Sequence, residues 1–268
     1  MNRLVTTSMF LLAVATTAPQ PERKKLFQLS ELTLDTKAQT SVLGARKVDP
    51  KLFAASFFSK DAQCTSSLVG PRALLLAAHC VKQGEAIAIA VSGREVTAVC
   101  TRAPEYDPVE NASPDYALCL TASEIVETPY FETVSTDAAR LAVGQEVLLT
   151  GFGCTKAGGG GDTSGTVYRV GEASITNLPT VTDNRIVTKG QAAVCYGDSG
   201  GPAFLQRIQD GGPRIQISVN SVGNIRDISG LASLGTAVAK NFLASWSQTH
   251  GVRICGVHPE QPKCRPFP

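Results

Sequence analysis

The chain has 268 residues, with 25 Lys and Arg against 23 Asp and Glu, which gives a net charge of +2. Apolar residues, with Tyr and Cys counted among them, make up 43% of it, so wholesale disorder is excluded and the length allows one large domain or two small ones. No long basic run and only three histidines occur, so neither a nucleic-acid partner nor a histidine-rich metal site is expected.

Residues 1–15 have the features of a secretory signal peptide. Arg3 supplies a positive charge, an apolar run covers residues 9–15, and Ala13-Val14-Ala15 offers the small residues that precede a signal-peptidase cut. The alternative is a buried N-terminal helix or strand. We expect export to the periplasm or the cell exterior, and no membrane span after the signal is removed, because no later apolar stretch is long enough.

Residues 16–41 are polar and of mixed charge, which predicts a linker or a pro-segment. From Val42 onward, short apolar runs alternate with turns that contain Gly and Pro, a pattern typical of an all-β sandwich or barrel. This strand-rich region could divide into halves near residues 135–145. The strand-sized runs cover residues 52–58, 73–78, 86–91, 95–100, 116–120, 146–151, 166–175, 185–188 and 214–222.

One helix is predicted, close to the C-terminus. Val238, Phe242, Leu243 and Trp246 recur at helical spacing and form one apolar stripe. Gly251 follows as a stop signal, and residues 251–268 form a short tail.

The most informative segment for chemistry is Gly197-Asp198-Ser199-Gly200-Gly201-Pro202. A serine hydroxyl becomes a useful nucleophile when a base takes its proton and N–H donors stabilise the oxyanion. Flanking glycines let the backbone turn tightly and expose its N–H groups. A plain glycine-rich turn is one alternative, and Gly-x-Ser-x-Gly also matches the nucleophile elbow of α/β-hydrolases.

His79 ends an apolar run that begins at Leu74, and it directly precedes Cys80. A histidine in this setting is usually structural. Cys64 lies earlier in the chain, however, and a disulfide to Cys80 would hold the segment that carries the imidazole. A general base must stay within hydrogen-bond reach of its nucleophile, so such a constraint suits a catalytic role.

Asp115 opens the apolar run that includes Tyr116 and Leu120. Most aspartates in this position are simple turn residues. In the presence of a suitable histidine and serine, Asp115 can instead be the buried carboxylate that orients the imidazole and stabilises its charged form.

With these segments in the order His, Asp, Ser, residues 42–250 resemble the trypsin/chymotrypsin family of serine endopeptidases. The resemblance implies two packed six-stranded antiparallel β-barrels with a C-terminal helix and catalytic groups in the cleft between the barrels. The segments that carry it are Cys64 with Leu76-Ala77-Ala78-His79-Cys80, Asp115-Tyr116-Ala117-Leu118, Thr150-Gly151-Phe152-Gly153, Gly197–Pro202 and, more loosely, Ser221-Val222-Gly223 and the helix around Trp246.

The resemblance also implies a role for each residue. His79 would be the general base and then the general acid, Asp115 its orienting carboxylate, and Ser199 the nucleophile. The N–H groups of Gly197 and Ser199 would form the oxyanion hole. The predicted partner is a polypeptide substrate, with no cofactor and no metal, and the protein is expected to be a monomer. A non-catalytic binding member of the same fold is the main alternative, and an α/β-hydrolase esterase is a weaker one.

In activated members of the family, a new N-terminal ammonium lies beside the aspartate that precedes the serine. Val42 and Asp198 would fill these positions here. The residues directly before Val42, Gln39-Thr40-Ser41, include no basic residue, and cleavage after Arg46 or Lys47 would leave a different first residue, so the maturation site stays open. An activating protease or a protein inhibitor is a possible partner.

The resemblance places Ala193 at the floor of the specificity pocket, where a carboxylate would be needed to bind Arg or Lys. Glycine walls leave room for a large side chain, so large apolar residues are expected before the scissile bond. Residues 218–220 are an alternative wall, and Asp227 could supply a carboxylate. The expected substrate-binding residues are Ala193, Ser221, Gly223 and Gly235.

Eight cysteines in an exported chain can all pair, and sequence alone allows 105 connectivities. The resemblance favours a bond between Cys64 and Cys80. In the expected fold, Cys154 would approach the loop that carries Cys195, and two first-barrel strands would bring Cys100 near Cys119. Cys255 and Cys264 would then close the tail.

Overall fold

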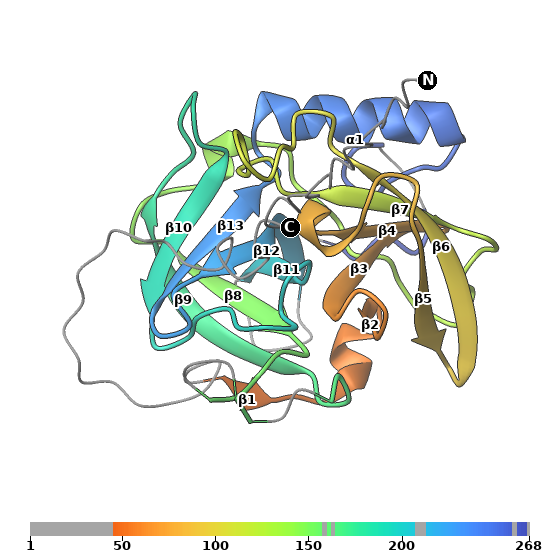
Figure 1. Cartoon of the computed structure of the whole chain (residues 1–268), viewed down its shortest axis with the longest axis horizontal. Helices are drawn as coiled ribbons and strands as arrows, with labels where there is room; N and C mark the ends of the chain where they lie inside the picture. Colours follow the sequence, from red (N-terminus) through yellow and green to blue (C-terminus); the bar gives the residue numbers. More distant parts are fainter. Residues whose placement is uncertain (1–44, 157–159, 162–163, 207–212, 259–261, 267–268) are drawn as a thin grey trace, which may run out of the picture.

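The computed structural model describes residues 45–156, 160–161, 164–206, 213–258 and 262–266. The predicted signal peptide (1–15), the segment 16–41 and Val42 lie outside these residues. Figure 1 shows two groups of strands side by side, with one helix lying along the group that begins with β2. Among the described residues, no helix is long and apolar enough to cross a membrane.

The first barrel is formed by six antiparallel strands in the order β2-β3-β4-β7-β6-β5, and β5 returns to lie beside β2. The apolar alternation along β5 and β6 explains one wall, because Ile87, Ile89 and Val96 point inward and are buried. The strands are β2 (Ser56–Ser59), β3 (Cys64–Gly70), β4 (Ala73–Leu76), β5 (Ala86–Val91), β6 (Arg94–Arg102) and β7 (Ala117–Thr121).

The second barrel is a ring of six antiparallel strands in the order β9-β10-β13-β12-β11-β8, closed by pairing of β8 with β9. The short β1 (Arg46–Lys47) pairs with β9 outside this ring. The expected pair of six-stranded barrels is therefore confirmed. The strands are β8 (Glu146–Gly151), β9 (Arg169–Asn177), β10 (Arg185–Gly190), β11 (Pro202–Gln206), β12 (Arg214–Gly223) and β13 (Ile228–Ser233).

The helix α1 (Ala237–His250) confirms the predicted C-terminal helix. The Thr236 side chain accepts a hydrogen bond from the Ala239 amide at its start, and Gly251 ends it in the left-handed conformation with φ of 62°. Phe242 and Trp246 bury the apolar face in the core of the first barrel. The helix thus fixes the chain after the second barrel onto the first.

Polar contacts join the two barrels. Ser67 on β3 donates a 2.9 Å hydrogen bond to Oε1 of Gln216 on β12, and both residues are fully buried. The amide of Thr65 donates to the carbonyl of Ser199 at 2.8 Å. Buried polar groups need such partners, so these contacts hold the loop that carries Ser199 against β3 of the first barrel.

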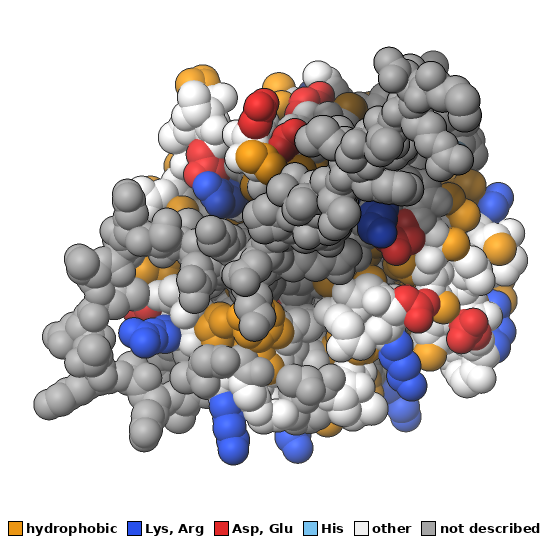
Figure 2. Space-filling model, in the orientation of Figure 1, with side chains coloured by type: hydrophobic (Ala, Val, Ile, Leu, Met, Phe, Trp, Pro, Cys, Tyr) orange, Lys and Arg blue, Asp and Glu red, His pale blue; other side chains and the backbone are white. Residues whose placement is uncertain are grey.

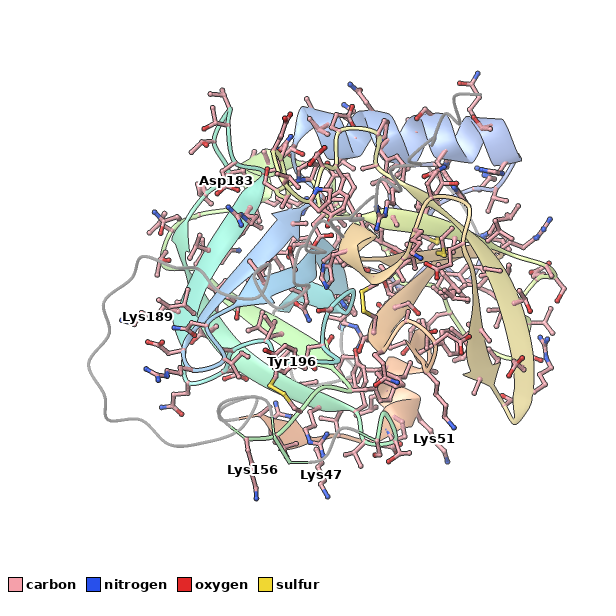
Figure 3. All side chains as sticks on the ribbon, viewed as in Figure 1. Lys47, Lys51, Lys156, Asp183, Lys189 and Tyr196 are labelled. Atoms are coloured by element: carbon pink, nitrogen blue, oxygen red, sulfur yellow. A yellow bond between two sulfur atoms is a disulfide. The ribbon has the colours of Figure 1, made fainter. Side chains whose placement is uncertain are left out.

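The surface carries charges of both signs. Lys and Arg side chains lie along the lower rim of the face shown in Figure 2, with Asp and Glu side chains above them. Lys47, Lys51 and Lys156 point outward along this edge, near β1 (Figure 3).

Candidate active site

The two barrels each supply part of the predicted catalytic group. His79 lies in a single 3-10 turn (Ala78–Cys80) directly after β4, and Asp115 lies just before β7, which pairs with β4. Ser199 lies in the loop between β10 and β11 of the second barrel. The structure brings His79 and Asp115 into direct contact.

The imidazole of His79 is held by Asp115 at two points. Nδ1 of His79 lies 2.6 Å from Oδ2 of Asp115, and the His79 amide donates to Oδ1 at 2.8 Å. The hydroxyl of Ser221 donates to the same Oδ2 at 2.5 Å. A carboxylate with these three donors fixes the ring so that Nε2 is the nitrogen left for chemistry.

Asp115 remains ionised although its residue is only 1% exposed. Burial by itself would raise the pKa of this carboxyl group. The charge of His79 and the hydrogen bonds from His79 and Ser221 outweigh that effect and lower the pKa below its ordinary value. The pair can therefore stabilise a positively charged imidazole.

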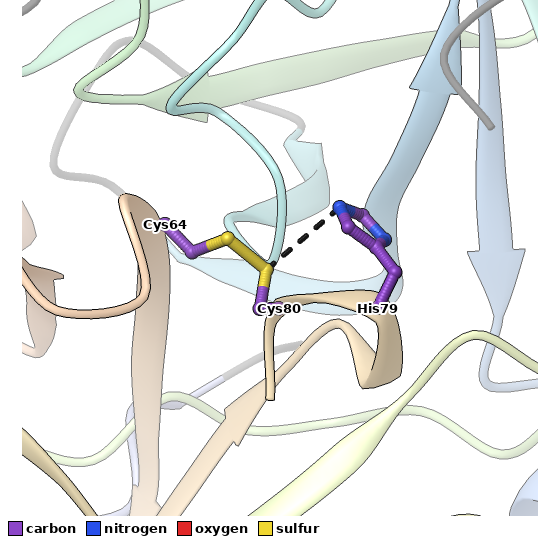
Figure 4. A group of neighbouring side chains, drawn as sticks. All are labelled: Cys64, His79 and Cys80. Atoms are coloured by element: carbon purple, nitrogen blue, oxygen red, sulfur yellow. Dashed lines mark hydrogen bonds between the residues drawn. A yellow bond between two sulfur atoms is a disulfide. The ribbon is translucent and has the colours of Figure 1, made fainter. Parts of the chain in front are cut away.

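The Ser199 hydroxyl is buried and has no hydrogen-bond partner among the described residues. Nε2 of His79 instead lies 3.8 Å from Sγ of Cys80, as Figure 4 shows. Proton transfer to Nε2 of His79 would need a hydrogen bond from the Ser199 hydroxyl, and none is present among the described residues. Such contacts are often long before substrate binds and shorten in the complex.

The backbone before Ser199 is arranged for anion binding. Among the residues that the structure describes, none accepts a hydrogen bond from the amides of Gly197 or Ser199. Gly197 has a φ of +95°, and a Cβ atom there would lie 3.0 Å from Cα of Gly153, so glycine is required. Two unpaired N–H groups beside a nucleophile can stabilise an oxyanion.

A disulfide and several hydrogen bonds hold the loop in place. Cys154 is bonded to Cys195, and its amide donates to the carbonyl of Tyr196 at 2.8 Å. The Thr65 hydroxyl donates to the carbonyl of Gly197 at 2.7 Å. Tyr196, next to this disulfide in Figure 3, is half exposed.

The Asp198 carboxylate lies against Gly151 and Gly153, at the end of β8 of the second barrel. Its carboxylate accepts from the amides of Gly153 (2.8 Å) and Cys195 (2.9 Å). Side chains at Gly151 or Gly153 would collide with this carboxylate, with Cβ distances of 2.3 and 2.4 Å. Burial raises the pKa of Asp198 to about 7, although the two amides and the charge of Arg169 act to lower it.

Arg169 was not singled out from the sequence. It pairs with Gly151 across β8 and β9, is 6% exposed, and donates to the carbonyl of Val167 at 3.0 Å. Gly151 is one of the two glycines at which a side chain would collide with the Asp198 carboxylate. The buried guanidinium of Arg169, on β9, thus acts on the buried carboxyl group of Asp198. No sequence motif marks Arg169 for this position.

One cluster has the composition of a metal site. Among the described residues, the side chains of Cys64, His79 and Cys80 bring three ligand-type atoms within 4.8 Å of one another (Figure 4). The two sulfur atoms are joined in a disulfide with an S–S distance of 2.02 Å. A metal ion binds cysteine as the thiolate, and neither sulfur is one here. The cluster is therefore not a metal site; its disulfide holds Cys80, the residue directly after His79.

The structure has four disulfides and no free cysteine. Cys100 and Cys119 face each other on β6 and β7. All four pairs agree with the expected ones: Cys64–Cys80, Cys100–Cys119, Cys154–Cys195 and Cys255–Cys264.

Among the expected specificity residues, Gly223 lies beside the segment that carries Ala193. A Cβ at Gly223 would contact Cγ2 of Val194, the residue after Ala193, so these positions share one site. A Cβ at Gly235 would lie 3.2 Å from Cα of Ala138, and the hydroxyl of Ser229 accepts a 2.9 Å hydrogen bond from the Val194 amide.

The alternative pocket groups are occupied elsewhere. The carboxylate of Asp227 contacts Lys189 at 3.6 Å and accepts from Asn224 at 2.9 Å. The Asn220 side chain donates to the carbonyls of Thr150 and Asp198 and is fully buried. Asn220 and Asp227 thus both have partners of their own; their roles as an alternative wall and an alternative carboxylate stay predictions.

The paired barrels, the His79–Asp115 contact and the loop around Ser199 define a chymotrypsin-fold protein. The chain matches the model of the Trypsin family over residues 43–242 and belongs to that family. No curated protein gave a significant match to it.

Solved structures of similar fold agree with this assignment. One is an atomic-resolution structure of HBP, with 15% identity, a TM-score of 0.57, and coverage of 76% of this chain and 95% of that one. Another is a mutant of human heparin binding protein (CAP37), with 16% identity, a TM-score of 0.58, and coverage of 77% and 96%. At these identities the likeness shows the fold alone.

Proposed function

We propose that this chain is an exported serine endopeptidase that cleaves polypeptides through an acyl-enzyme. The observation that carries this proposal is the Asp115–His79 pair, held at 2.6 Å and supported by Ser221. The unpaired amides of Gly197 and Ser199 add the second requirement, a site for the oxyanion. The four disulfides suit an oxidising compartment outside the cytosol.

In this mechanism Nε2 of His79 takes the proton from the Ser199 hydroxyl as the oxygen attacks the substrate carbonyl carbon. The amides of Gly197 and Ser199 stabilise the negative oxygen of the tetrahedral intermediate. His79 then gives its proton to the leaving amine, and the acyl group stays on Ser199. Water, activated by the same imidazole, releases the acid product.

We further propose that the segment before Val42 is removed and that the new ammonium pairs with Asp198. Support comes from the buried Asp198 carboxyl, whose pKa is raised by a desolvation that the two amides and Arg169 offset only in part. A cation brought beside it would favour the ionised form and fix the Ser199 loop. Full activity of protein whose Ser41–Val42 bond is intact, shown by N-terminal sequencing, would contradict this step.

Apolar side chains are the proposed preference before the scissile bond, with Phe and Leu ahead of Arg. Ala193 and Val194 are both 1% exposed and contribute only hydrocarbon. Asp227, the carboxylate that could have bound Arg, faces Lys189. An unpaired cationic group in such a pocket would cost several kcal/mol.

The competing function is a non-catalytic binding member of the same family. The 3.8 Å contact of His79 Nε2 with Cys80, and a Ser199 hydroxyl without a hydrogen-bond partner among the described residues, are the features that favour it. The α/β-hydrolase alternative is excluded by the paired antiparallel barrels.

Hydrolysis of an unfolded protein substrate separates the two functions. We expect the mature chain to degrade reduced, alkylated casein, and the Ser199→Ala and His79→Ala variants to lose nearly all of this activity. His258, which lies outside the catalytic group, provides a histidine control: His258→Ala should retain the activity. Equal rates for wild type and Ser199→Ala would contradict the proposal.

A further inference from the structure

Arg169 is a buried cation of the second barrel that has no role in the catalytic steps described above. It begins β9, is 6% exposed, and lies directly opposite Gly151 of β8 in the antiparallel register. The two strands lie side by side in the second barrel (Figure 1). Arginine is rarely buried to this extent unless it is paired.

The strand register directs the Arg169 side chain toward Asp198. Residues directly opposite each other in an antiparallel pair project from the same face of the sheet. A Cβ atom at Gly151 would lie 2.3 Å from Oδ1 of Asp198, so the Asp198 carboxylate lies on the face from which Arg169 projects. Because Gly151 has no side chain, the carboxylate can approach the two strands at this point.

A second contact places the guanidinium beside a residue that binds Asp198. Nη1 of Arg169 lies 3.5 Å from the carbonyl oxygen of Gly153 and 3.0 Å from that of Val167. The amide of the same Gly153 donates to Oδ1 of Asp198 at 2.8 Å. The cation and the carboxylate therefore contact one residue, the cation at its carbonyl and the carboxylate at its amide.

The charge of Arg169 bears on whether Asp198 is ionised. Both groups are buried, so salt screens their interaction only weakly. Burial raises the pKa of Asp198, the amides of Cys195 and Gly153 and the charge of Arg169 lower it, and the result is a pKa of about 7. An ionised carboxylate accepts from these two amides in charge-assisted hydrogen bonds, which are roughly twice as strong as neutral ones. Ionisation of Asp198 therefore tightens the loop that carries Ser199.

We propose that Arg169 is a positioning residue, an internal counter-charge that holds Asp198 and the Ser199 loop in the catalytic arrangement before the chain is cleaved. The inference rests on the proposed endopeptidase function and adds a basal activity of the uncleaved chain to it. With Arg169 in place, the loop does not depend wholly on a new ammonium at Val42. Arg169 acts through Asp198, and not on the reacting atoms.

The first test uses the wild-type chain. The uncleaved form, with its Ser41–Val42 bond shown to be intact by N-terminal sequencing, is labelled with a fluorophosphonate at slightly alkaline pH. We expect a rate of about a hundredth to a tenth of that of the chain that begins at Val42, because part of the uncleaved population has the catalytic arrangement. Labelling of the cleaved chain together with no labelling of the uncleaved chain would overturn the inference.

Substitutions of Arg169 test the residue itself. In the uncleaved chain, Arg169→Gln should lower the labelling rate about tenfold or more, whereas Arg169→Lys, which keeps the charge, should retain most of it. In the chain cleaved before Val42, Arg169→Gln should have a much smaller effect, because the ammonium then supplies the charge. Arg94→Gln is the control for loss of an arginine charge, since Arg94 lies in the first barrel and pairs with Glu127.

The titration of Asp198 provides a readout that a merely structural arginine would not move. In the uncleaved chain carrying Ser199→Ala, the effect of Asp198→Asn on the free energy of unfolding is measured against pH. The native pKa of Asp198 lies above its ordinary value of 3.8, so the stability from its protonated form is lost as the pH rises through about 7. With Arg169→Gln, the midpoint of this loss should lie about one pH unit or more higher.

An unchanged midpoint in Arg169→Gln, or equal labelling of the uncleaved Arg169→Gln and wild-type chains, would also overturn the inference. The comparison of cleaved and uncleaved wild type uses no substitution, so it stays decisive if Arg169→Gln fails to fold. The midpoint is measured in protein without catalysis. Absence of labelling from every form, which would contradict the endopeptidase proposal, is therefore distinguishable from a failure of the contact between Arg169 and Asp198.

Discussion

The amide of Gly153 donates a 2.8 Å hydrogen bond to Oδ1 of Asp198, and this contact joins the loop after β8 to the residue before the proposed nucleophile. The Cys154–Cys195 disulfide joins the same two segments. The orientation of Asp198 and the position of the Ser199 loop are therefore coupled. A change in the charge state of Asp198 acts directly on the geometry of the site.

This coupling predicts a pH-dependent stability for the uncleaved chain. The native pKa of Asp198 is about 7, above its ordinary value of 3.8, so the native state binds more protons than the unfolded state between these values. Stability supplied by the protonated carboxyl is thus present at low pH and is lost as the pH rises through about 7.

Denaturant unfolding of wild type and Asp198→Asn at several pH values measures this effect. We expect wild type to lose about 2–4 kcal/mol relative to the variant as the pH rises through this range. A free energy difference that stays constant with pH would contradict the assignment. In protein that begins at Val42, the new ammonium should flatten the dependence.

The two disulfides of the first barrel predict different consequences for activity. They close loops of 16 and 19 residues, so removing either one should destabilise the fold by about 3 kcal/mol in the chain-entropy model. Cys80 follows His79 directly, whereas Cys100 and Cys119 lie away from it.

We therefore expect the double variant at Cys64 and Cys80 to lose both stability and kcat. The double variant at Cys100 and Cys119, with alanine at both positions, should lose a similar stability but keep kcat per folded molecule. Thermal unfolding and active-site titration under folding conditions compare the two. Equal loss of kcat in both variants would show that the first disulfide does not position His79.

The apolar pocket predicts the selectivity of the proposed endopeptidase. Peptide substrates that differ only in the residue before the scissile bond should show kcat/KM for Phe and Leu about tenfold or more above that for Arg. Ala193→Asp should raise the value for Arg, because it places a carboxylate at the floor. Faster cleavage after Arg by wild type would mean that the pocket is assigned to the wrong residues.

The elements that could be predicted from sequence are those with a clear apolar period. The helix α1 was predicted from its stripe and its glycine stop, and β5 from its short apolar run between turn residues. β3 and β13 were missed because both include serines in a short run. Their hydroxyls are buried and paired, as with Ser67, so polarity along the chain does not report exposure there.

Arg214 illustrates the same difficulty. An arginine is expected at the surface, yet Arg214 is fully buried, lies over the ring of Phe53 and pairs with the fully buried Glu132 at 2.5 Å. The two residues lie far apart in the chain, and only the packing of the barrels brings them together.

Part of the candidate site could be predicted from sequence and part could not. His79, Asp115 and Ser199 lie in local motifs that could be recognised, and the structure brings the first two into contact. The contact of Ser221 with Asp115 and the position of Ser229 near Val194 depend on the register between β12 and β13, which includes a bulge. The role of Gly235 as a pocket wall, expected from the resemblance, stays a prediction.

The most direct test of the endopeptidase account is labelling of the mature chain with a fluorophosphonate, followed by peptide mapping. An activated serine reacts with this reagent, whereas an ordinary serine hydroxyl does not. We predict a single label on Ser199, its loss in Ser199→Ala, and a strongly reduced rate in His79→Ala. Absence of the label from Ser199 in mature wild type, or labelling of His79→Ala at the wild-type rate, would contradict the account.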